Sequence, residues 1–194
     1  MSKLLTIIKK IPKTPLTFRD IAGATSMNTN TLRVSLHRLM KHGDLISLRK
    51  GLYSLADKDM DIERIAAEMC YPSYFSCEWA LAHHGLIHQI PYRLELMTPK
   101  RSRTLSIGSK EISVHHLKMD LFWGYEITDG IWMATPEKAI IDILYLRRLG
   151  KKTLPVDEIR WKSVNRKKLL QFARKTRKSF LVLACEGLNE KLFH

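Results

Sequence analysis

The sequence is poor in cysteine, in long apolar runs and in acidic residues. Its three cysteines, Cys70, Cys77 and Cys185, are odd in number and too widely spaced for a disulfide framework or a C-x-x-C zinc pair. No apolar run approaches the length of a membrane span, and the N-terminus carries no signal-peptide core. These absences favour a protein that works in the reducing cytoplasm without a membrane partner.

Motifs for phosphate chemistry are also missing. The chain contains no G-x-x-x-x-G-K or G-x-G-x-x-G loop. No acidic residue is followed two positions later by lysine, as a nuclease core requires. Gly108-Ser109 suits a nucleotidyltransferase, but Asp120 is followed by Leu121 and Phe122 rather than by a second paired acid. We therefore predict that the chain is not an enzyme and has no catalytic residues.

The histidines and cysteines form no recognisable site. His84 and His88 are four residues apart, but the glutamate of the zinc motif H-E-x-x-H is absent between them. Cys77 precedes His83 and His84, yet nothing in the sequence marks an activated thiol, so we expect a buried structural cysteine. The sequence thus predicts no metal ligands and no cofactor.

The shortage of acids makes the 194-residue chain strongly basic, with 33 Lys and Arg against 19 Asp and Glu and a net charge of +14. Residues 1–56 carry a formal charge of +8, residues 57–146 carry −4, and residues 147–180 carry +11. A basic surplus favours an anionic partner, most often nucleic acid. The charge pattern predicts a first domain over 1–56 and a second over 57–194, with a basic helical end from about 147.

Residues 1–56 follow the element order of a winged helix-turn-helix. The apolar spacing predicts a helix over 4–11, a short helix capped by Thr17, and a longer helix over about 29–42 that Gly43 ends. Two apolar runs within 45–55 then flank a glycine-containing tip, which predicts a hairpin.

The longer helix has a polar and basic face opposite its apolar positions. A DNA-reading helix needs small polar residues near its N-terminus and cations further along for the phosphates. The residues predicted to contact double-stranded DNA are Thr29, Asn30, Thr31, Arg33, Val34, His37, Arg38 and Lys41 on the helix, and Arg49 and Lys50 at the hairpin tip. Two alternatives stay open, a solvated helix face and a winged domain that docks a protein partner instead of DNA.

The middle of the chain is predicted to be α+β. Thr135-Pro136-Glu137 is a helix start, since it combines an N-cap residue, a proline at the first helical position and an acid. Asp129-Gly130 is a strong hairpin dipeptide, and Ser76 is the predicted N-cap of a helix over 77–84. The other predicted elements are a helix over 62–69 and strands over 92–98, 104–107, 111–117, 121–128 and 131–134.

The C-terminal end is predicted to be helical and basic. Asn165 caps a helix whose polar side carries Arg166, Lys167, Lys168, Arg174 and Lys175, and a final helix follows from Phe180. We expect this basic side to contact DNA phosphates or an acidic protein, with a solvated helix face as the alternative.

The order of several short motifs resembles the AbiEi-type abortive-infection antitoxins, members of type IV toxin–antitoxin systems. These motifs follow the winged helix-turn-helix pattern and cover nearly the whole chain. They are Tyr74-Phe75-Ser76, Ala80-Leu81, His84-Gly85-Leu86, Gln89-Ile90-Pro91, Thr98-Pro99-Lys100-Arg101 with Arg103, Val114-His115-His116-Leu117, Phe122-Trp123-Gly124, and Ala134-Thr135-Pro136-Glu137-Lys138-Ala139 with Asp142.

The resemblance implies a transcriptional regulator that represses its own toxin–antitoxin operon. It implies an N-terminal domain that binds operator inverted repeats, which is compatible with a dimer on the DNA, and a C-terminal domain that counters a nucleotidyltransferase toxin. Direct binding, indirect opposition and modification of the toxin all remain open. Pro136, Glu137 and Lys138 keep structural explanations, and Asp142 is expected to pair with a nearby cation rather than to act in catalysis.

Overall fold

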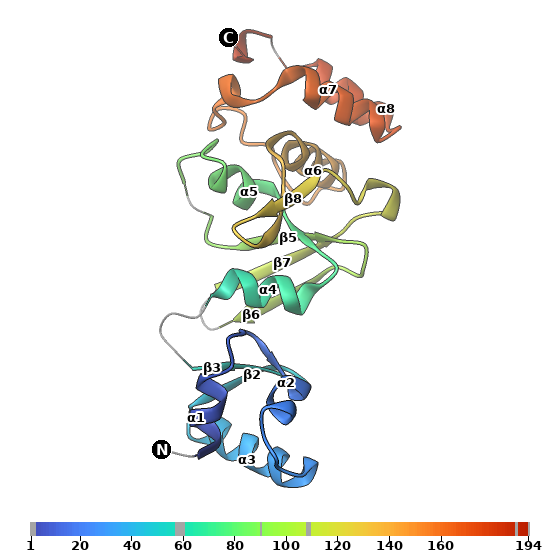
Figure 1. Cartoon of the computed structure of the whole chain (residues 1–194). Coiled ribbons are helices and arrows are strands. Elements are labelled where there is room, and N and C mark those ends of the chain that lie inside the picture. The colour runs from blue at the N-terminus through green and yellow to red at the C-terminus, as the bar shows by residue number, and fades with distance from the viewer. Residues whose placement is uncertain (1–2, 57–60, 90, 108–109, 189, 194) are drawn as a thin grey trace. The chain divides into compact units, whose positions relative to one another are not determined.

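The computed structural model describes residues 3–56, 61–89, 91–107, 110–188 and 190–193. They form a mixed α+β protein, which confirms the predicted α+β class (Figure 1). The chain divides into two compact units, Met1–Met69 and Cys70–His194. The division falls later than the boundary expected after residue 56, because most of a helix over Ile62–Cys70 (α4) belongs to the first unit.

The first unit begins with three helices and a small sheet. The sheet has the strand order β1-β3-β2, and both strand pairs are antiparallel. The elements are α1 (Lys3–Lys9), β1 (Leu16–Thr17), α2 (Phe18–Gly23), α3 (Thr29–Lys41), β2 (Leu45–Arg49) and β3 (Leu52–Leu55).

Side-chain caps fix where α2 and α3 begin. The Thr17 hydroxyl accepts a hydrogen bond from the Asp20 amide, and the Asp20 carboxylate accepts one from the Thr17 amide at 2.7 Å, so the two form a capping box. Asn28 caps α3 by accepting from the Thr31 amide at 2.9 Å. Gly43, at a φ of +79°, follows the end of α3 as predicted.

The three helices and the sheet of the first unit share one apolar core. The predicted inner positions of α3 are correct, since Leu32, Leu36 and Leu39 are buried and Met40 packs against them. The other buried members are Leu4, Leu5, Ile8, Leu16, Ile21 and Leu45. This core uses one side of α3 and therefore leaves its opposite side without cover from the unit.

The second unit is built around a six-stranded mixed sheet with the strand order β6-β7-β5-β4-β9-β8. Helices α5 and α6 pack against the sheet and each other, and α7 and α8 pack on α6 (Figure 1). The elements are β4 (Tyr74–Phe75), α5 (Cys77–His83), β5 (Leu94–Thr98), β6 (Arg103–Ile107), β7 (Lys110–His116), β8 (Tyr125–Thr128), β9 (Ile131–Ala134), α6 (Pro136–Arg148), α7 (Arg166–Lys175) and α8 (Ser179–Glu186). Short 3-10 turns cover Met119–Leu121, Trp161–Ser163 and Glu190–Phe193.

Two strand predictions in this unit need correction. The predicted strand over 121–128 begins only at Tyr125. Leu121 instead ends a 3-10 turn, and its side chain is buried in the core. Strand β5 starts at Leu94 and does not alternate, since it lies inside the sheet with all five residues buried. The sequence reading also missed β4, whose two residues are too few to give a pattern.

The turns of the second unit follow the sequence signals. Asp129 and Gly130 both have positive φ and join β8 to β9, as a tight hairpin requires. Gly108 and Ser109, which separate the strands predicted over 104–107 and 111–117, lie outside the described residues, as do residues 57–60. Within the described part of the chain, no helix has the length and apolar character needed to cross a membrane.

Candidate functional site

The outer face of α3 carries the residues predicted to read DNA. Thr29, Asn30, Thr31, Arg33, Val34, His37, Arg38 and Lys41 are all exposed. The helix contains no acidic residue, and the Arg33 guanidinium lies over the Phe18 ring at 5.9 Å. The structure thus brings together polar groups near the start of α3 and cations further along it on one uncovered face.

The β2–β3 hairpin carries a second group of basic residues in this unit. Lys50 at its tip is exposed, and the side chain of Arg49 lies outside the described part of the structure. The Gly51 carbonyl accepts a hydrogen bond from the Phe18 amide at 2.8 Å, which fastens the tip to the first residue of α2. Phe18 also contacts Arg33, so this residue connects the tip of the hairpin to α3 within the unit.

Helix α7 differs from α3 because most of its cations have partners within the chain. Lys168 contacts the buried Glu137 carboxylate at 2.9 Å, and Arg174 lies 3.8 Å from Glu186. Lys175 stands 4.2 Å from the centroid of the Trp123 ring, and Arg166 lies over Phe193. Of the five predicted contact residues, Lys167 alone is exposed without a partner in the described structure.

A buried polar cluster, which we call the Asp142 cluster, ties α6 to the β4–α5 segment. It consists of Asp142, Lys138, Tyr74 and Ser76. One Asp142 oxygen accepts from the Tyr74 hydroxyl at 2.9 Å and from the Ser76 hydroxyl at 2.8 Å, and the other forms an ion pair with Lys138. The expected cation partner of Asp142 is therefore confirmed. Ser76 lies at the N-cap position as predicted, but its hydroxyl binds Asp142 instead of capping α5.

Aromatic rings and a glycine cover the Asp142 cluster. The Lys138 ammonium lies 5.3 Å from the Tyr74 ring and 5.4 Å from the Trp123 ring. Gly124, at a φ of +80°, passes so close that a Cβ there would stand 3.0 Å from the Lys138 side chain. Burial lowers the pKa of Lys138, against the effect of Asp142, and raises that of Tyr74 well above its usual value. Full burial and complete pairing give this cluster a structural role.

A second group of ionisable residues faces a cavity of about 1150 Å³ in the same unit. We call it the carboxylate cluster, and it consists of Glu78, Glu95, Lys152 and His115. Lys152 forms ion pairs with both carboxylates, and His115 Nε2 lies 3.5 Å from Glu95 Oε1. All four side chains are at least about four-fifths buried, Glu95 most deeply.

The two carboxyl groups of this cluster have very different pKa values. Burial, followed by the hydrogen bond and charge of Glu95, raises the pKa of Glu78 to about 7. Burial opposes ionisation of Glu95 as well, but hydrogen bonds from His115 and Glu78 and the nearby Lys152 bring its pKa to about 2. The charges of Cys77, Glu95 and Glu78 raise the pKa of Lys152 although burial lowers it. Lys152 and Glu95 therefore stay charged near neutral pH, while Glu78 exchanges a proton.

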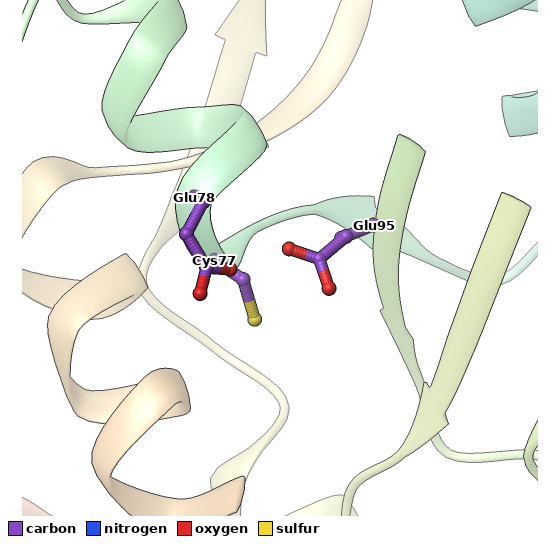
Figure 2. Close-up of side chains that lie close together, drawn as sticks. All are labelled: Cys77, Glu78 and Glu95. Atoms are coloured by element: carbon purple, nitrogen blue, oxygen red, sulfur yellow. The ribbon is translucent and has the colours of Figure 1, made fainter. Parts of the chain in front are cut away.

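Cys77 borders the carboxylate cluster and is buried, as the sequence predicts. Burial first, and the charge of Glu95 second, raise the pKa of its thiol well above the usual value, so the thiol is not activated. Figure 2 shows Cys77, Glu78 and Glu95 together, with the Cys77 side chain between those of the two glutamates. Sequence reasoning missed this site because its members lie far apart in the chain. The available signal was Glu95, an acid within the buried strand Leu94–Thr98.

No family model matches this chain, and no curated protein is significantly similar to it.

Proposed function

We propose that the first unit contains a winged helix-turn-helix and that the protein is a DNA-binding antitoxin that represses its own operon. The observation that carries this proposal is the outer face of α3, on which all eight predicted contact residues are exposed and no acid is present. A surface without acids and with several cations suits the phosphate backbone of double-stranded DNA.

The element order gives the mode of binding. Helix α3 enters the major groove, with Asn30 and Thr31 near the base edges and Arg38 and Lys41 toward the phosphates. Val34, which is 52% exposed, is suited to the methyl group of a thymine. Lys50 at the tip of the β2–β3 hairpin reaches an adjacent phosphate or groove.

The antitoxin part of the proposal rests on the resemblance to the AbiEi-type family. In this proposal the protein works in the cytoplasm, binds operator inverted repeats and counters a nucleotidyltransferase toxin encoded beside it. The three unbonded thiols, Cys70, Cys77 and Cys185, suit a reducing compartment.

Binding of the full chain to its own upstream DNA tests the proposal. Arg38→Ala removes an exposed cation from the face of α3, so we expect an affinity loss of about 1–3 kcal/mol and a salt slope reduced by about 1. Fluorescence anisotropy with labelled DNA at several salt concentrations measures both. Arg148→Ala, which removes an exposed cation of the second unit, is the matched control and leaves binding unchanged.

The same assay distinguishes the second candidate function. If the wild-type chain does not bind upstream DNA even at low salt, the winged unit docks a protein partner instead. The exposure of Val34 in the middle of the α3 face favours this second candidate, because an apolar side chain also suits a protein surface.

A further inference from the structure

The thiol of Cys77 is a buried group that the DNA-binding proposal does not use. Cys77 is the first residue of α5 and has a positive φ of 56°, which is uncommon for a residue with a side chain. Its side chain is fully buried, and no hydrogen bond to its thiol occurs in the described structure. Figure 2 shows the Cys77 side chain between those of Glu78 and Glu95.

The spacing of these three side chains is close to that of metal ligands. One ligand atom from each of Cys77, Glu78 and Glu95 lies within 4.8 Å of the other two. Tetrahedral zinc, with bonds of about 2.0–2.3 Å, holds its ligand atoms about 3.5 Å apart. The longest separation therefore has to close by about 1 Å, which is within the range of glutamate side-chain rotation.

We propose that Cys77, Glu78 and Glu95 form a binding site for a divalent transition-metal ion of the zinc class. A thiolate with two carboxylates favours zinc or cobalt over magnesium or calcium, which prefer oxygen ligands alone. The three side chains leave a fourth position free, and it faces the cavity of about 1150 Å³, through which the ion enters.

The surrounding charges fit a dication. The ion displaces the proton of the Cys77 thiol, and that of Glu78 where it is protonated, into the solvent. The resulting thiolate and two carboxylates carry three negative charges, and the Lys152 ammonium beside them carries one positive charge. The remaining charge of −2 is balanced by one divalent ion. Lys152 contacts Oε2 of Glu78 and Oε1 of Glu95, so Oε1 of Glu78 and Oε2 of Glu95 lie outside these ion pairs.

His115 completes the surroundings as an orienting partner. Its Nε2 is buried and lies 3.5 Å from Glu95 Oε1. Outer-shell partners of this kind orient metal-binding carboxylates. His115 is therefore placed as a positioning residue for Glu95 and not as a ligand.

Titration of the full, reduced chain with Co²⁺ tests the site. A cobalt–thiolate bond gives a charge-transfer absorption in the near ultraviolet, and Zn²⁺ added afterwards removes it. We expect this band in the wild-type chain and its loss in Cys77→Ser. We also expect weakening of more than about 100-fold in Glu95→Gln, which exceeds the effect typical of outer-shell partners. Cys185→Ser, which changes another buried thiol of the same unit, is the control and keeps the band.

A second variant keeps the test decisive if Cys77→Ser does not fold. Lys152→Met removes the positive charge beside the carboxylates, so we expect Co²⁺ to bind about tenfold more tightly. The proposal is overturned if neither the wild-type chain nor Lys152→Met gives the band. It is equally overturned if a folded Cys77→Ser protein keeps it. Arg38→Ala binds Co²⁺ like the wild type, so this test is independent of the DNA-binding proposal.

Discussion

Asp142 shows how much one residue of this protein depends on distant parts of the chain. Its position four residues after Lys138 predicts an ion pair along a helix, and the structure contains that pair. Its other two partners, Tyr74 and Ser76, lie 68 and 66 residues away in the chain. No local pattern indicates them, because they reach Asp142 only when β4 and α5 meet α6.

Removal of the Asp142 charge is expected to destabilise the second unit strongly. Asp142→Asn leaves the Lys138 ammonium buried without its counterion, so we expect a loss of about 3–5 kcal/mol in the free energy of unfolding. All four tryptophans, Trp79, Trp123, Trp132 and Trp161, lie in the second unit, so their fluorescence during urea unfolding reports on that unit.

Two further variants check this interpretation. Asp157→Asn, at an exposed position of the same unit, leaves the unfolding free energy unchanged. The double variant Lys138→Met/Asp142→Leu removes both charges, so neither is left buried without its partner. We therefore expect it to lose less free energy of unfolding than the two single variants lose together. If the free-energy losses of the two single variants simply add up in the double variant, Lys138 and Asp142 are not energetically coupled.

At the scale of elements, α3 and α7 look alike in sequence but differ in the structure. Both are amphipathic and basic, and both are capped by an asparagine. Helix α3 packs one side into the core of its unit and leaves its cations exposed. Helix α7 packs near Trp123 and Glu137, which bind two of its lysines. The sequence predicts two equivalent basic faces. Tertiary contacts give most cations of α7 a partner within the chain, whereas the cations of α3 form no ion pair among the described residues.

Adjacent lysines of α7 are therefore expected to behave differently. Lys168→Gln removes the partner of the buried Glu137 carboxylate, so we expect a loss of about 1–2 kcal/mol in the free energy of unfolding. Lys167→Gln, at an exposed neighbouring position, is the matched control and has no measurable effect. Tryptophan fluorescence in urea measures both variants. Equal stability of the two contradicts the internal role of Lys168.

At the scale of the whole molecule, the two basic parts of the chain carry their positive charge in different ways. The charge of +8 in residues 1–56 is spread over exposed helix and hairpin positions, whereas part of the +11 in residues 147–180 is paired internally. The mildly acidic middle contains both Glu78 and Glu95, whose carboxyl groups are held with Lys152 inside the second unit. These buried acids make the stability of that unit depend on pH.

The expected pH dependence follows from the two shifted carboxyl groups. Glu78 has a folded pKa of about 7 against an ordinary value of 4.5, so the folded state holds its proton more tightly. Stability therefore falls as pH rises from about 4.5 to 7, by about 2–3 kcal/mol. Glu95, with a folded pKa of about 2, stabilises the fold above pH 4.5, and this contribution is lost as pH falls toward 2.

Urea unfolding followed by tryptophan fluorescence, with a chelator present to exclude metal ions, measures this curve. Glu78→Gln is expected to remove the decline between pH 4.5 and 7, because the amide does not titrate. Glu126→Gln, an exposed position on β8, keeps the wild-type curve. A wild-type stability that stays constant across this window shows that Glu78 is not held protonated.

The sequence by itself determined the local features of this protein. Apolar spacing placed α3 and α6, Gly43 set the end of α3, and Asp129-Gly130 set the turn between β8 and β9, because each of these signals acts within a few residues. It also placed the polar face of α3 opposite its apolar positions, because the helical period separates the two faces. Only the tertiary structure decided that β5 is buried on both faces, that most cations of α7 have partners within the chain, and that Cys77 lies close to Glu78 and Glu95, which both line one cavity. Those outcomes depend on contacts between segments far apart in the chain, which no local pattern encodes.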